Sequence, residues 1–196
     1  MNIDDSTISL FVRRSIGPRG SALGLTIISG RFFVRYKPVL SIPQQESRAK
    51  NAVAEFLFRQ LIVPKVFVDA PWPKEHSRVD VLAVDRSGAG EVHVVEIKVG
   101  AQSLAAAGAV LADLMKIPAH FRYLAIFENN NYVPDESSLY ALDGMGRIGI
   151  IQVMEDDAGD LAAELRVRPE RFRFDVSFKL VDKFTAAHPA YIEIRP

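Results

Sequence analysis

The chain has 196 residues, of which 48% are hydrophobic and 24% are charged, and its formal net charge is zero. These values fit a globular protein with one domain, or one domain and a small appendage, and they argue against a general polyanion-binding protein. The absence of cysteine excludes a disulfide framework, a thiolate metal site and a cysteine nucleophile. We expect a cytoplasmic protein with no membrane partner, because there is no signal-peptide pattern and no apolar run near the ~20 residues that span a bilayer.

Residues 1–44 predict an N-terminal β or irregular arm, or a hairpin. Their β-branched and aromatic runs are broken by Gly24, Gly30 and Pro38, which indicates one or two short strands with a turn near Ser29-Gly30. This part of the chain also has more basic than acidic residues. Such a segment could follow a phosphate backbone, although dispersed arginines are more often only solvated.

Residues 45–155 predict an α/β core that begins with a helix. Ala49, Val53 and Leu57 fall on one amphipathic face of the segment 44–63, and Pro64 marks its end. Alternating or continuous apolar runs predict three strands at 65–72, 78–85 and 91–99, the last two joined as a hairpin. After them we expect a helix from about residue 102 to Pro118, a strand at 123–128, a short helix at 134–142 and a strand at 147–155.

Residues 156–196 predict a C-terminal β-rich extension of the same domain. Strand-like pieces occur at 164–169, 171–176 and 191–196, and a helical turn is expected at 180–187. Strands that alternate with crossover helices imply a layered α/β domain, with a mixed central sheet flanked by helices.

Three charged residues interrupt the strands at 78–85 and 91–99. Asp80 lies in the first, while Glu96 and Lys98 emerge on one face of the second because side chains alternate along a strand. If the two strands pair as a hairpin, the carboxylates of Asp80 and Glu96 converge. Two carboxylates so close need a cation between them, or one of them must take a proton.

A magnesium or manganese ion would suit this place. The two carboxylates and the main-chain carbonyl of Ile97 are hard oxygen ligands of the kind these ions prefer. Lys98 would orient or help to deprotonate an attacking water and offset charge that develops on a phosphate. The alternative is that Asp80, Glu96 and Lys98 only form ion pairs. A cluster of three charges on a buried strand would however be an expensive way to gain stability.

The order of elements and the motif together resemble the PD-(D/E)XK nuclease superfamily. The residues that carry the resemblance are Asp80 in "RVDVLAV" and Glu96-Ile97-Lys98 in "VHVVEIKVG", set between two helices. The resemblance covers residues 45–128 and implies a restriction-endonuclease-like core, with helix, three strands, helix and strand in that order. It implies that Asp80 and Glu96 bind magnesium and that Lys98 acts at the water.

Two features of the family are less well matched. Many members carry a further glutamate on the first helix, for which Glu55 is the candidate and Glu46 the alternate. The proline that precedes the motif aspartate in the family is replaced here by Val79, which we discount because that proline is loosely held.

The sequence therefore predicts a magnesium- or manganese-dependent nuclease that hydrolyses phosphodiester bonds in DNA, with a homodimer left open. Phosphate contacts are expected from basic residues of the N-terminal segment and from four arginines near the C-terminus, Arg166, Arg168, Arg171 and Arg173. One alternative is a catalytically inactive member of the fold that serves as a binding or assembly module in a repair or defence complex. A third is an unrelated α/β domain.

Overall fold

The computed structural model describes residues 8–12, 22–28, 31–37, 40–72, 78–87, 90–100, 110–127, 148–156, 158–173 and 178–193. By its internal contacts the chain divides into two compact units, Met1–Ser41 and Ile42–Pro196. No helix in the described ranges is long and apolar enough to cross a membrane.

The first unit contains a three-stranded antiparallel sheet in the order β1-β2-β3. Its strands are β1 (Ile8–Val12), β2 (Ala22–Ile28) and β3 (Arg31–Lys37). β2 and β3 pair in register from Ala22↔Lys37 to Ile28↔Arg31, as expected for two runs separated by a short turn. The first unit thus has three strands, where the sequence predicts one or two.

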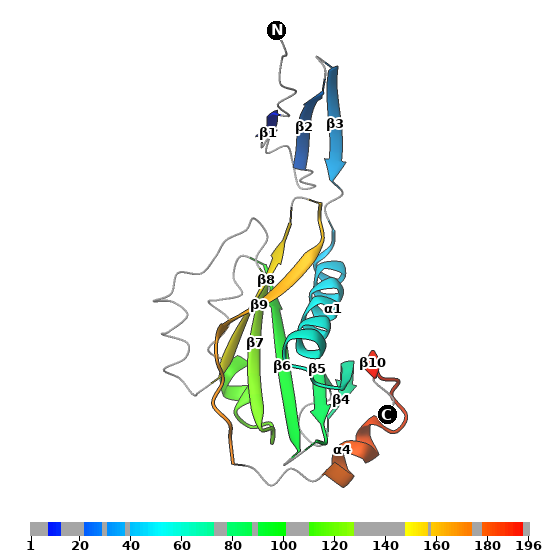
Figure 1. Cartoon of the computed structure of the whole chain (residues 1–196), viewed down its shortest axis with the longest axis vertical. Coiled ribbons are helices and arrows are strands. Elements are labelled where there is room, and N and C mark those ends of the chain that lie inside the picture. The colour runs from blue at the N-terminus through cyan, green and yellow to red at the C-terminus, as the bar shows by residue number, and fades with distance from the viewer. Residues whose placement is uncertain are drawn as a thin grey trace. The chain divides into compact units, whose positions relative to one another are not determined.

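The second unit begins with α1 (Ile42–Gln60) and contains a seven-stranded mixed sheet. In spatial order its strands are β10 (Ile192–Glu193), β4 (Lys65–Pro71), β5 (Arg78–Asp85), β6 (Glu91–Val99), β7 (Phe121–Phe127), β8 (Gly149–Glu155) and β9 (Leu161–Val167). Only the β6–β7 and β7–β8 pairs are parallel. The predicted α/β class with a mixed sheet is confirmed (Figure 1).

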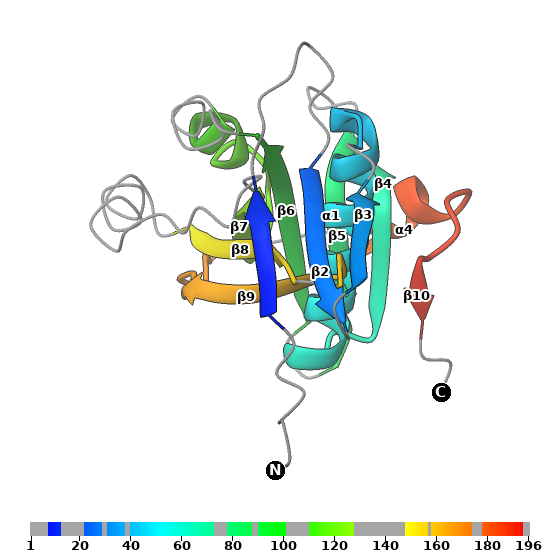
Figure 2. The same ribbon diagram turned by 90° about the horizontal axis from the view of Figure 1, so that it is seen from above.

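Helices lie on both faces of this sheet. One face packs against the buried stripe of α1, which includes Val53 and Leu57. The other packs against the helical residues 110–114 and against α4 (Phe178–Thr185), through Leu111, Leu114 and Val181. Seen from above, β8 and β9 run across the direction of β5 and β6, so the sheet is strongly curled (Figure 2).

Three of the predicted elements are found only in part, are not formed, or fall outside the described residues. The described part of the predicted helix 102–118 is helical at 110–114, and the predicted helix 134–142 lies outside the described residues. The expected strand at 171–176 is wrong in its described part, since residues 171–173 are irregular. There the amide of Phe172 donates to the carbonyl of His120, and its ring stacks 4.0 Å from the guanidinium of Arg122.

Candidate functional site

The ladder between β5 and β6 opens at Asp80. The two strands pair antiparallel from Asp85↔Glu91 to Val81↔Val95, and the next step of this register would place Asp80 opposite Glu96. Instead, the carboxylate of Asp80 takes the place of a main-chain acceptor: its Oδ2 accepts a hydrogen bond of 2.7 Å from the amide of Ile97. We call this place the β5–β6 fork.

The fork brings Asp80 and Glu96 together. Their side chains lie close enough for a hydrogen bond between them to contribute to the pKa of Glu96. Burial raises the pKa of Glu96 to about 7, and the negative charge of Asp80 adds to the rise, while Lys98 and Lys50 oppose it. Burial of Glu96 and the charge of Asp80 thus outweigh the two lysines in their effect on this pKa.

Lys98 lies on the same side of β6 as Glu96, two residues further along the strand. Its side chain is half-buried, and its charge acts on Glu96. Ile97, between them, is buried in the core on the α1 side. Three of the residues predicted for the site thus occupy one short stretch of the sheet together with Asp80.

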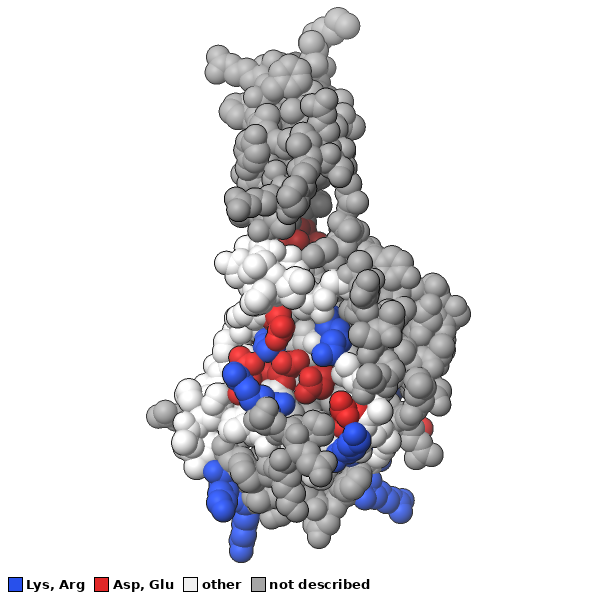
Figure 3. Space-filling view, turned by 180° about the vertical axis from the view of Figure 1, so that it is seen from behind, with Lys and Arg blue, Asp and Glu red and all other residues white. Residues whose placement is uncertain are grey.

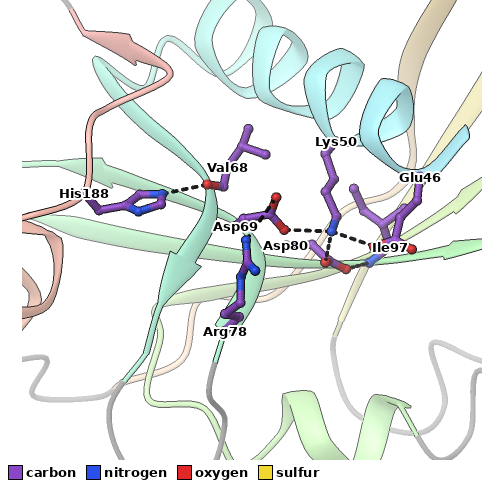
Figure 4. Close-up of polar contacts among 8 residues, drawn as sticks. All are labelled: Glu46, Lys50, Val68, Asp69, Arg78, Asp80, Ile97 and His188. Carbon is purple, nitrogen blue, oxygen red and sulfur yellow. Dashed lines mark hydrogen bonds and ion pairs between the residues drawn. The ribbon is translucent and has the colours of Figure 1, made fainter. Parts of the chain in front are cut away.

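A second cation, Lys50, reaches the fork from α1 and was missed by the sequence analysis. Its ammonium nitrogen lies 2.8 Å from Oδ1 of Asp80, 2.8 Å from Oδ1 of Asp69 and 2.6 Å from Oε1 of Glu46 (Figure 4). Burial lowers the pKa of Lys50, but hydrogen bonds to these three carboxylates outweigh it, so its pKa is raised and it stays charged. We call Glu46, Asp69 and Asp80 the acidic triad.

Asp69 reaches the triad through an irregularity in β4. The β4–β5 ladder lacks a pair at Asp69 and Asp80, although the pairs on either side are formed, and Asp69 has a left-handed φ of 55°. Asp69 also pairs with Arg78 at 3.2 Å. A non-glycine residue with a left-handed φ, such as Asp69, costs about 1–3 kcal/mol and persists where surrounding contacts fix it. One contact next to Asp69 is that of His188, which donates from Nε2 to the carbonyl of Val68 at 2.8 Å (Figure 4).

Glu55, the first candidate for a helix glutamate, does not join the fork. It pairs with Arg59 one turn further along α1, at 3.2 Å, and it lines a groove of about 380 Å³ between α1 and β9. Glu46 is the helix glutamate that the structure brings to Asp80, through Lys50. The helical period explains the difference, because nine residues are two and a half turns and place Glu46 and Glu55 on opposite sides of α1.

The donor set at the fork suits a hard divalent cation in its chemistry. Asp80, Glu96 and the main-chain carbonyl of Ile97 offer oxygen ligands only, and burial, followed by the charge of Asp80, raises the pKa of Glu96. In the described part of the chain, no group of three or more His, Asp and Glu side chains is arranged to hold a metal ion.

Charges of both signs are mixed on the surface of the second unit. Figure 3 shows acidic side chains gathered in the middle of one face, with lysine and arginine side chains around them.

Comparisons with known proteins show a shared fold and no family. No family model and no curated protein matches the chain. Its fold has a counterpart. A protein of unknown function from Silicibacter pomeroyi is 19% identical over 75% of this chain and 86% of its own, with a TM-score of 0.50. A repair endonuclease from Pyrococcus abyssi is 14% identical over 71% of this chain and 85% of its own, with a TM-score of only 0.28.

Proposed function

We propose that the chain is a metal-dependent nuclease with a restriction-endonuclease-like core of the PD-(D/E)XK type, which hydrolyses phosphodiester bonds in DNA. The observation that carries the proposal is the β5–β6 fork, where Asp80 and Glu96 share a hydrogen bond and Lys98 follows on the same side of the strand. The order of elements also agrees: α1, the antiparallel strands β4 to β6, the helical residues 110–114, and β7 parallel to β6.

Each residue of the fork has a distinct role in the proposed reaction. Asp80, Glu96 and the main-chain carbonyl of Ile97 would hold a magnesium or manganese ion, which supplies charge stabilisation and a more acidic water. The amide of Ile97 fixes the orientation of Asp80 through its hydrogen bond. Lys98 orients the attacking water and offsets the negative charge that develops on the phosphate oxygens.

Arginines of the segment after β9 are suited to bind the DNA backbone. Arg168, Arg171 and Arg173 are all exposed. Because arginine contacts with phosphates release counterions from DNA, affinity for DNA should fall steeply as salt rises. An affinity that is insensitive to salt would exclude this surface as the DNA contact.

The test is cleavage of linear, circular and single-stranded DNA by the purified chain in the presence of magnesium or manganese. Lys98→Ala and Asp80→Asn should abolish cleavage while both variants stay folded. Glu55→Gln, which changes an exposed glutamate on the same helix as Lys50, should cleave as the wild type does. If the wild type neither cleaves nor binds either ion in calorimetry, the nuclease proposal is wrong.

One observation favours the second candidate, a non-catalytic module on this fold. The acidic triad already has a cation, since Lys50 contacts all three carboxylates. A chain that neutralises its own acids in this way needs no ion to keep its core stable. The calorimetric arm of the same experiment separates the candidates, because only the nuclease requires an ion at Asp80 and Glu96.

A further inference from the structure

Lys50 lies where three elements of the second unit present a carboxylate to one point. Glu46 comes from α1, Asp69 from β4 and Asp80 from β5, and each lies between 2.6 and 2.8 Å from the Lys50 nitrogen. An ammonium group has three N–H donors and no acceptor, so the triad offers one carboxylate for each proton. The Lys50 side chain is only 9% exposed, so water contributes little to its solvation.

The same three carboxylates are the kind of ligand that a divalent ion selects. Three carboxylates drawn together without a cation repel one another, and oxygen ligands in such a group favour magnesium, manganese or calcium. Lys50 reaches this point from the helix and occupies it. Two cations within about 4 Å of one another would also repel at a cost of several kcal/mol near a protein surface.

We propose that Lys50 is a built-in cation that takes the place of a divalent ion within the acidic triad. Any divalent ion is thereby confined to the Glu96 side of Asp80, so the β5–β6 fork and the acidic triad together bind no more than one. Lys50 is a positioning residue, because it acts on the reaction through the orientation and charge of Asp80. The confinement to one ion rests on the proposed function, whereas the role of Lys50 in the triad does not.

The two carboxylate oxygens of Asp80 have different partners, one in the acidic triad and one in the β5–β6 fork. Oδ1 contacts Lys50, and Oδ2 contacts the amide of Ile97 at the start of the Glu96 side. Removal of the Lys50 side chain beyond Cβ leaves Oδ1 of Asp80 and the oxygens of Glu46 and Asp69 without their shared cation. A small ion can then enter the space that the ammonium leaves.

The test is the number of Mn²⁺ ions bound by the full chain, measured by calorimetry and by electron paramagnetic resonance of free Mn²⁺. Lys50→Ala should bind one ion more than the wild type. Lys50→Met is the matched control, since it removes the charge but keeps most of the length of the side chain, and it should bind the same number as the wild type. Lys50→Ala/Asp69→Asn, with one triad carboxylate neutralised, should lose most of the gained affinity.

The outcomes separate this inference from the proposed function. One ion in the wild type and two in Lys50→Ala supports both. No ion in the wild type and one in Lys50→Ala supports the role of Lys50 and overturns the metal site at Asp80 and Glu96. Equal numbers in the wild type and Lys50→Ala overturn the role of Lys50, whatever the activity.

A folding measurement covers the case in which Lys50→Ala is unfolded without ions. Circular dichroism should then show the variant regaining its structure as Mn²⁺ is added. The same Mn²⁺ concentrations should raise the melting temperature of the wild type by less than that of the variant, or not at all. Lys50→Ala that stays unfolded at every Mn²⁺ concentration, while Lys50→Met folds, would contradict the proposal, because a divalent ion would then be unable to replace the ammonium.

Discussion

The amide of Ile97 donates a 2.7 Å hydrogen bond to Oδ2 of Asp80, so a side chain of β5 replaces a main-chain acceptor at the point where β5 and β6 separate. This single contact fixes the carboxylate between the strands. It also leaves Oδ1 of Asp80 turned toward Lys50. The position of Asp80 is therefore determined by backbone as well as by charge.

Replacement of Asp80 should separate these two contributions. Asp80→Asn keeps an oxygen acceptor for the Ile97 amide, whereas Asp80→Ala leaves that amide without its partner. An unsatisfied buried donor costs about 1–3 kcal/mol, so we expect Asp80→Ala to lower the free energy of unfolding by about that much more than Asp80→Asn does. Urea denaturation measures both values, and equal losses would show that the Ile97 contact contributes nothing to stability.

Glu96 should make the stability of the protein fall as pH rises. Burial, together with the charge of Asp80, raises the pKa of Glu96 from 4.5 to about 7. Between these two values the folded protein holds a proton that the unfolded chain has lost, so the free energy of unfolding decreases with rising pH and then levels off above the folded pKa. The total effect is at most about 3 kcal/mol.

The measurement compares the wild type with Glu96→Gln in chemical denaturation at successive pH values, without divalent ions. The variant should gain stability relative to the wild type from pH 4.5 to about 7 and keep that gain above it. Glu55→Gln serves as a control for the general effect of removing an acid. A stability difference between Glu96→Gln and the wild type that is constant over this range would rule out the coupling.

Glu46 and Glu55 should differ in their effect on stability, although both are glutamates of α1. Glu46 contacts the largely buried Lys50 at 2.6 Å, while Glu55 pairs with Arg59, whose side chain is 69% exposed. A buried partner that loses a charged acceptor costs more than an exposed pair, so Glu46→Gln should destabilise by about 1–2 kcal/mol and Glu55→Gln by less than about 1 kcal/mol. Thermal denaturation of the two variants measures these losses of stability. A larger loss for Glu55→Gln than for Glu46→Gln would contradict the greater importance of the Glu46–Lys50 contact.

Gly90 and Gly100 lie just before and just after β6, and replacing each of them by alanine tests how closely the chain packs at the start of this strand. Both have left-handed φ values, 71° and 106°, so alanine is strained at either position. A Cβ at Gly90 would also lie 2.5 Å from the ring of Phe178, whereas nothing lies within 4 Å of one at Gly100. Gly90→Ala should therefore lower the melting temperature more than Gly100→Ala does, and Phe178→Ala in the Gly90→Ala background should remove part of the difference.

The sequence predicts the sheet that carries the fork because its signals are local. Apolar runs bounded by glycine and proline locate β4, β5 and β6, and side-chain alternation places Glu96 and Lys98 on one side of β6. Asp80 and Glu96 could be paired in advance because a hairpin with a short loop leaves few registers open.

Lys50 and Asp69 could not be predicted in the same way. Four residues after Glu46 on a helix, Lys50 resembles an ordinary solvated i, i+4 partner. Its burial depends on how α1 packs over the sheet, and the inward turn of Asp69 depends on a left-handed residue in β4. Both are properties of the tertiary structure. The helical period places Glu46 and Glu55 on opposite sides of α1. It would have favoured Glu46 only if the position of Asp80 relative to α1 had been known.

Asp69, Asp80 and Glu96 belong to strands that follow one another in a continuous antiparallel meander, β4 to β6. Contacts between these neighbouring strands close small loops, at a lower entropic cost than the longer crossovers that the parallel pairs β6–β7 and β7–β8 require. Asp69, Asp80 and Glu96 are therefore brought together by short stretches of chain. Lys50 of α1 supplies the ammonium that contacts two of these acids, so the packing of α1 on the sheet also compensates charge.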